Sequence, residues 1–217
     1  MAEETIELEK PSLLGMITSP KEQFERIKKR PIFLGALLTV SFLVMLGSWL
    51  NINNAGVPMI EGLTEEEVVF FTNVMTVVVG LFTPIFSVLF TSVIYLLIAK
   101  IVQSNVTFKQ LFSMNTYIMI VAALSLIVNG IFVLVMGGGP ENQDALFTSL
   151  GSIINADGAI GILLNNIEIF SIWTVVLTAI GLQQVANLTK RMAWTITIAF
   201  FIVGIIMAMG GTNLPGA

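Results

Sequence analysis

The stretch SPKEQFERIKKRP, which runs from Ser19 to Pro31, decides the fold class of this chain. It holds five of the ten basic residues in the sequence, and 19 uncharged residues, from Ile32 to Leu50, follow it directly. A helix of that length rises about 28 Å, close to the thickness of the hydrocarbon core of a bilayer. Basic residues beside the first membrane-spanning helix usually stay in the cytoplasm. The stretch therefore predicts a membrane protein and the direction in which its spans run.

The same stretch predicts a short helix of its own before the first span. Ser19 is a favoured N-cap, Pro20 suits the first helical position, and Glu22 completes the pattern of a capping box. Phe24 lies on an apolar face, basic residues occupy the others, and Pro31 ends the helix. We therefore expect this stretch to form an amphipathic helix in the cytoplasmic interface of the membrane.

The composition of the chain excludes several kinds of protein. Hydrophobic residues make up 55% of it and charged residues 11%, whereas soluble domains contain about 25% charged residues. The sequence has no Cys and no His, which removes disulfides, thiol nucleophiles, histidine bases and the usual zinc and haem ligands. No basic face with interleaved aromatic residues indicates nucleic-acid binding. We therefore expect a protein of the lipid bilayer that has no enzymatic activity, no cofactor and no metal.

Apolar runs along the chain predict an all-α membrane protein, a bundle of five transmembrane helices. The expected spans lie at about 32–50, 68–99, 111–136, 167–186 and 192–209. The expected flanking segments are an acidic N-terminal segment, the interfacial helix and a short external tail, at 1–18, 19–31 and 210–217.

Local signals refine the second and third spans. Thr64 with Glu67, and Thr107 with Gln110, predict capping boxes at their starts. The second span is longer than a bilayer requires, and Pro84 supplies a point at which it can bend. The long loop after the third span, 137–166, is not plainly hydrophilic, so it could lie in the interface or form a re-entrant segment.

The distribution of charge tests the number and the direction of the spans. With five spans, residues 1–31, 100–110 and 187–191 lie on one side, and these segments hold all ten Lys and Arg residues. The segments expected on the other side hold acidic residues and no basic residue. Because basic segments tend to remain in the cytoplasm, we expect the N-terminus inside the cell and the C-terminus outside.

Glu168 adjoins the fourth span without an obvious partner in the sequence. Asn165 and Asn166 precede it, which places it near the outer edge of the membrane. We favour the interpretation that it lies in the interface or complements a helix dipole, and a functional role is the alternative. No predicted span has Asp, Glu, Lys or Arg in its interior, which argues against a proton relay or an ion-coupled carrier.

Three segments resemble the Yip family of five-span membrane proteins, which were first known as partners of Ypt/Rab GTPases. They are the stretch quoted above, TFKQLFSMNTYIMI before the third span, and IEIFSIWTVVLTAIGLQQV in the fourth span. The resemblance extends from about Ile17 to Met207. The residues that carry it are Pro20, Phe24, Pro31, Phe170, Trp173 and Gly181.

The chain looks like the bacterial branch of that family, in which Rab GTPases are absent. Within this branch it is similar to a small membrane protein associated with an ABC-type exporter for a toxic peptide. The resemblance thus implies a bacterial cell membrane as the location and no known catalysis.

Two hypotheses for the function follow. The first is a binding protein that assists another membrane complex, and the resemblance implies an ABC-type exporter that protects against a toxic peptide. Contact would come from helix packing in the bilayer and from the basic cytoplasmic face, which includes Arg26. The alternative is a small transporter or channel subunit, with Pro84, the outer loop and Glu168 lining a path.

Overall fold

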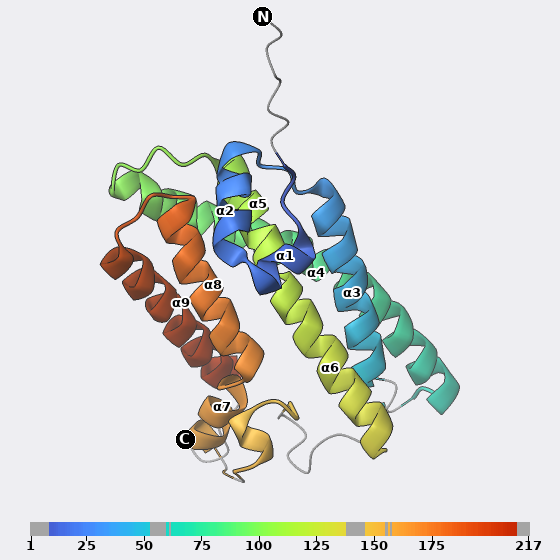
Figure 1. Ribbon diagram of the computed structural model, residues 1–217. Coiled ribbons are helices and arrows are strands. Elements are labelled where there is room, and N and C mark those ends of the chain that lie inside the picture. Colours follow the sequence, from blue (N-terminus) through green and yellow to red (C-terminus); the bar gives the residue numbers. More distant parts are fainter. Residues whose placement is uncertain are drawn as a thin grey trace, which may run out of the picture.

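The computed structural model describes residues 9–52, 60, 62–137, 146–154, 156 and 158–211. Figure 1 shows a bundle of long helices with short helices against its two ends. The long helices are α3 (Leu34–Ile52), α4 (Glu65–Ile101), α5 (Phe108–Ile118) continued by α6 (Ile120–Met136), α8 (Ile169–Gln184) and α9 (Lys190–Gly211). The short elements are α1 (Leu13–Thr18), α2 (Pro20–Lys29), the 3-10 turn η1 (Leu150–Ser152) and α7 (Gly158–Asn166). Most of the expected tail lies outside the described residues.

The long helices form two groups. In the first, α3 packs against both α4 and α6, and in the second, α8 packs against α9. Contacts of α8 with α5 and α6 join the groups. Gly80 permits the close approach of α4 to α3, because a Cβ atom there would lie 2.7 Å from the Met45 Cα atom. The α4 helix continues through Pro84, which is buried.

The starts of α4 and α5 follow from the two capping boxes that the sequence predicts. The Thr64 hydroxyl accepts a hydrogen bond from the Glu67 N–H, and the Glu67 carboxylate accepts one from the Thr64 N–H at 2.9 Å. Thr107 and Gln110 form the same reciprocal pair. Each box satisfies N–H groups that the first helical turn leaves unpaired. Both predictions are confirmed.

Four helical segments of the described chain are long and apolar enough to cross a membrane: α3, α4, the α5–α6 segment and α9. Met119 separates α5 from α6, but helical hydrogen bonds continue on both sides of it, so one apolar segment of 29 residues remains. The expected fourth span is α8, whose 16 residues rise about 24 Å, less than the about 30 Å of a hydrocarbon core. An all-α membrane fold is confirmed, whereas the count of five spans remains a prediction.

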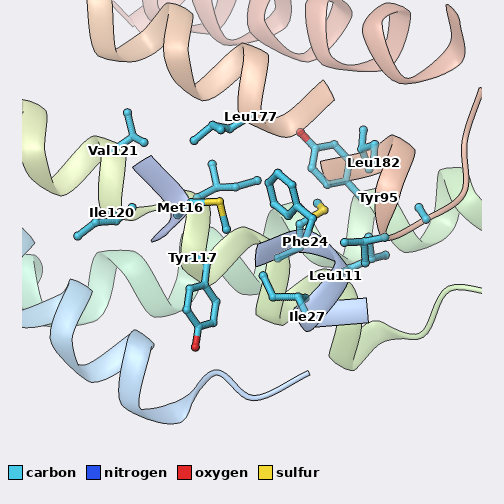
Figure 2. Close-up of a cluster of buried hydrophobic side chains, with 14 of the residues drawn as sticks. Met16, Phe24, Ile27, Tyr95, Leu111, Tyr117, Ile120, Val121, Leu177 and Leu182 are labelled. Carbon is cyan, nitrogen blue, oxygen red and sulfur yellow. The ribbon is translucent and has the colours of Figure 1, made fainter. Parts of the chain in front are cut away.

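The α1–α2 pair packs into the bundle beside α5 and α8. Met16 and Phe24 are fully buried, and Figure 2 shows them in one apolar cluster with Leu111, Leu177 and Leu182. Burying each such side chain contributes about 1.5–3 kcal/mol. The apolar face of α2 therefore contacts protein, while its basic residues remain largely at the surface.

The capping box predicted at the start of α2 is wrong. The Ser19 side chain makes no cap hydrogen bond to α2; instead its hydroxyl donates to the Gly15 carbonyl at 3.4 Å. Glu22 bonds to Arg26 at 2.5 Å and not to the backbone of Ser19. The reason is that α1 ends directly before Ser19, so the preceding turn competes for its hydroxyl.

Three segments that the charge pattern assigns to one side of the membrane do meet at one end of the bundle. The Lys28 ammonium donates to the Asn187 side-chain oxygen at 2.5 Å, and the Gln110 amide donates to the Lys28 carbonyl at 2.8 Å. The Ser104 hydroxyl donates to the Ala186 carbonyl at 2.6 Å. We call this end of the bundle the basic end.

Candidate functional site

Glu168 lies at the opposite end of the bundle, where it immediately precedes α8. Its side chain is 5% exposed. The residue occupies the N-cap position of α8, as the dipole interpretation expects, but its carboxylate makes no cap hydrogen bond. The carboxylate is instead held by groups from three other places in the chain, which the sequence does not reveal.

Three hydroxyl groups donate to the Glu168 carboxylate. The hydroxyls of Ser125 on α6 and Thr148 in the outer loop both bond to Oε1, the latter at 2.8 Å. The Ser171 hydroxyl on α8 bonds to Oε2 at 3.1 Å. Asn129, 1% exposed on α6, donates to the Thr148 hydroxyl oxygen at 2.9 Å and to the Ser125 carbonyl at 2.9 Å. We call Glu168, Ser125, Thr148, Ser171 and Asn129 the carboxylate network.

A short antiparallel backbone pairing positions the outer loop in this network. The Leu150 N–H donates to the Ile167 carbonyl at 3.0 Å, and the Ile169 N–H donates to the Thr148 carbonyl at 3.4 Å. The Thr148 N–H also donates to the Asn129 side-chain oxygen at 3.2 Å. The loop is therefore held against α6 and α8 by backbone as well as side chains. The two positions expected for this loop, in the interface or re-entrant, both remain predictions.

A groove with a volume of about 470 Å³ lies between the α4–α5–α6 helices and the α8–α9 pair. Its hydroxyl- and amide-bearing lining residues are Ser87, Thr91, Tyr95, Asn115, Asn166, Ser171, Thr174, Thr178 and Thr197. Apolar residues such as Val88, Phe200 and Ile205 make up the remainder of the walls. We call this cavity the helix groove.

A smaller cavity of about 260 Å³ adjoins the helix groove on the side of Glu168. It is lined by Glu168 and by residues of α6 and α8, and three lining residues, Ala122, Ser171 and Thr174, belong to both cavities. We call it the inner cavity. The only buried carboxylate among the described residues thus faces a space that adjoins a groove among the membrane helices.

The structure brings together two of the residues that carry the family resemblance, Phe24 of α2 and Gly181 of α8. A Cβ atom on Gly181 would lie 2.8 Å from the Met114 sulfur and 3.1 Å from the Phe24 ring. The glycine therefore lets the Met114 and Phe24 side chains, from α5 and α2, pack closely against α8 here. Phe24 and Gly181 form a packing site at the basic end.

The other resemblance residues lie apart from one another. Pro20 occupies the first position of α2, Pro31 follows that helix, and both are half-buried. Phe170 packs against the central core, whereas Trp173 is 39% exposed on the outer side of α8. The exposed indole is typical of a residue that anchors a helix at the membrane interface.

Arg26 and Pro84 do not belong to either cavity. Arg26 forms ion pairs with Glu22 and Glu9 and donates to the Lys10 carbonyl at 3.3 Å, so it fastens the N-terminal segment to α2. Pro84 is absent from the linings of both the helix groove and the inner cavity. Pro84 is buried within α4, which presents later residues to the groove. The expected path lined by Pro84, the outer loop and Glu168 remains a prediction.

Sequence reasoning did not find the carboxylate network or the helix groove. Asn129 and Ser125 are spaced four apart within an apolar run, which is the signal that polar side chains share one helix face. Thr148 lies in a loop with no pattern that would link it to either helix. Only the folded chain relates it to Glu168.

Comparison with known proteins identifies the class to which this fold belongs. Residues 14–211 match the family model of the Yip1 domain, and the chain is a member of this family of membrane proteins. The predicted family is confirmed.

A particular relative is "Membrane protein YknW" of Bacillus subtilis (strain 168). The two sequences are 33% identical over 213 residues, which cover 93% of this chain and 90% of the relative. No solved structure matches the chain.

Proposed function

We propose that this protein has no enzymatic activity and that it binds and assists another integral membrane complex, with an ABC-type exporter as the class of partner. The family membership supports a multi-pass protein that acts in the bilayer. The choice of an ABC-type exporter that removes a toxic peptide rests on the resemblance to the bacterial branch.

The observation that carries this proposal is the polar group on the exposed face of α4. The first half of α4 buries Thr76 and Gly80 but leaves Phe70, Val74 and Val78 exposed. Apolar exposure alone is expected of any helix that faces lipid. This face is distinguished by Asn73, which lies among apolar residues of α4 beyond the glutamates at the helix start.

Asn73 offers the hydrogen bond that a partner helix would complete. Its amide N–H group donates to the Val69 carbonyl at 3.0 Å, whereas its side-chain oxygen is buried and has no hydrogen-bond partner among the described residues. A polar atom without a partner is unfavourable in an apolar medium. Hydrogen bonds between transmembrane helices contribute about 0.6–2 kcal/mol. A transmembrane helix with a hydrogen-bond donor would therefore be stabilised against this face, with the Asn73 side chain turning its oxygen toward that donor.

Co-purification tests the proposal. The tagged protein is extracted in a mild detergent from its native membrane, and a stoichiometric ABC-type permease is expected by mass spectrometry. Asn73→Leu should reduce its recovery severalfold. Gln183→Leu is the matched control, because Gln183 also donates to the carbonyl four residues before it, at 2.9 Å, but lies on α8. Recovery of no stoichiometric membrane partner, or equal losses for both variants, would contradict the proposal.

We also propose that the basic end faces the bacterial cytoplasm. All ten basic residues belong to segments expected on that side, and hydrogen bonds join three of these segments. Single cysteines replacing Gly62 and Asn105 can be labelled on intact cells with an impermeant reagent. We expect labelling of the cysteine at position 62 and not of the one at position 105. Labelling at position 105 would overturn the orientation.

A transporter or channel subunit is the second candidate function. The observation that favours it is the helix groove, whose hydroxyl-bearing walls lie among the membrane helices and continue toward Glu168. Flux of a substrate through the purified protein in vesicles, and its loss in Glu168→Gln at normal expression, would support this candidate over the first.

A further inference from the structure

We propose that the helix groove and the inner cavity together bind an amphiphilic amine from the bilayer. Its protonated nitrogen would lie against the Glu168 carboxylate, and its alkyl chain would lie along the helix groove. This site goes beyond the proposed function, since it concerns a small ligand and not the partner complex.

The first argument is the charge of Glu168. Every Lys and Arg of the sequence lies within the described residues, and Glu168 forms no ion pair among them. The length of α8, about 24 Å, separates Glu168 from the basic end. A buried charge without a counterion is strongly unfavourable. A cationic group in the inner cavity would supply the missing counterion.

The second argument is the direction of the hydrogen bonds. Asn129 donates to the Thr148 hydroxyl oxygen at 2.9 Å, so the Thr148 proton is left to donate to Glu168 at 2.8 Å. Ser125 and Ser171 also donate to the carboxylate. An ionised carboxylate only accepts hydrogen bonds, and each of the three hydroxyls lies within reach to donate to it.

The carboxylate also retains room for a ligand. Oε1 receives two hydroxyl donors, whereas Oε2 receives only the one from Ser171, at 3.1 Å. A carboxylate offers about four lone-pair sites, so one remains available on the Oε2 atom. Glu168 lines the inner cavity, from which an ammonium group could donate a hydrogen bond to this lone pair.

The third argument is the character of the helix groove. Its volume of about 470 Å³ falls in the about 300–1,000 Å³ range of small-molecule sites. No charged residue lines it, and its apolar walls include Ile118 and Phe201. These walls suit an alkyl chain, and the position of the groove among the membrane helices suits a ligand that partitions into lipid.

The same walls disfavour an anionic or zwitterionic ligand. The Thr91 and Thr197 hydroxyls donate to carbonyls of their own helices, at 2.7 and 2.9 Å, so they do not offer those protons to an anion. Neither cavity is lined by Lys or Arg. We therefore infer a ligand with a single positive charge and not a phospholipid with an amine headgroup.

Direct binding of radiolabelled dodecylamine to the full chain in phosphatidylcholine nanodiscs tests this inference. Empty nanodiscs give the amount that dissolves in lipid alone. We expect saturable binding at one site per chain, and a loss of affinity of at least about tenfold in Glu168→Gln. Glu66→Gln is the matched control, because Glu66 is an exposed carboxylate expected on the same side of the membrane, and it should bind as the native chain does.

A second variant separates loss of the site from loss of the fold. The Thr174 side chain lines both cavities and makes no hydrogen bond among the described residues, so Thr174→Trp should fill the space while it leaves the carboxylate network intact. It should abolish saturable binding without lowering the unfolding temperature of the ligand-free protein by more than a few degrees.

Competition defines the outcomes that would overturn the inference. Dodecanol, which has the same chain and no charge, should compete weakly, and equal competition would mean that the groove recognises only the chain. Displacement of the amine by sodium chloride but not by potassium chloride would point to a sodium site instead. Equal binding by native protein and Glu168→Gln, or full displacement by phosphatidylethanolamine in the nanodisc, would also reject the proposed site.

Discussion

The two ends of the bundle are held together by different kinds of interaction. At the basic end, α1 and α2 insert Met16 and Phe24, both fully buried, among apolar residues of α5 and α8. At the opposite end, three hydroxyls and Asn129 surround the Glu168 carboxylate. Apolar contacts depend on volume and area, whereas hydrogen bonds depend on directed donors. The basic end should therefore respond to changes of volume, and the carboxylate network to the loss of single hydroxyls.

Phe24→Ala should produce the largest effect. It removes a fully buried ring from the contact between α2, α5 and α8, which we expect to lower the free energy of unfolding by about 3–5 kcal/mol. Reversible unfolding in mixed micelles measures it. Phe86→Ala is the control, because that ring is 66% exposed on α4. An equal loss of stability in the two variants would show that the loss in Phe24→Ala does not come from the packing of α2.

Thr148→Val should have the next largest effect. It removes the donor to Glu168 at 2.8 Å and one acceptor of the Asn129 amide, which still donates to the Ser125 carbonyl. Hydrogen bonds to charged groups contribute about 1.5–3 kcal/mol, and we expect a loss of stability of that size. A double-mutant cycle with Glu168→Gln should give a coupling energy above about 0.5 kcal/mol. Additive effects would mean that the two side chains do not interact.

Gly181→Ala tests the packing site at the basic end with a single methyl group. The methyl group would lie 2.8 Å from the Met114 sulfur, and because a methionine end can move, we expect a loss of about 1–2 kcal/mol, the lower part of the usual cost of overpacking. Gly204→Ala has open space around the new methyl group and should be neutral or slightly stabilising. Equal thermal stability of the two variants would contradict the close packing.

Arg26→Gln should have the smallest effect. The Arg26 side chain is 24% exposed, and its partners Glu9 and Glu22 are 72% and 56% exposed, so water and salt screen both ion pairs. We expect a change in stability of about 0–1 kcal/mol, decreasing further in high salt. A larger, salt-independent loss would show that Arg26 does more than fasten the N-terminal segment.

The comparison also shows where sequence reasoning reached the structure. The spacing predicts the short helix with Phe24 on its apolar face, and Gly181 is one of the residues that carry the family resemblance. Neither showed that the two residues touch, because they are far apart in the chain and no local pattern relates them. The predicted box at Ser19 failed because α1, which packs just before it, takes up the hydroxyl.

The sequence by itself determined the membrane class, the long helices and the segregation of charge, because the bilayer sorts a chain by apolar length and by cationic side chains, which are local properties. Only the tertiary structure decided the surroundings of Glu168. Its donors come from α6, a loop and α8, and hydrogen bonds between distant segments form only when packing brings them within reach. The same packing places the helix groove beside the carboxylate. The pattern of hydrophobic residues along the chain does not predict a groove between helices.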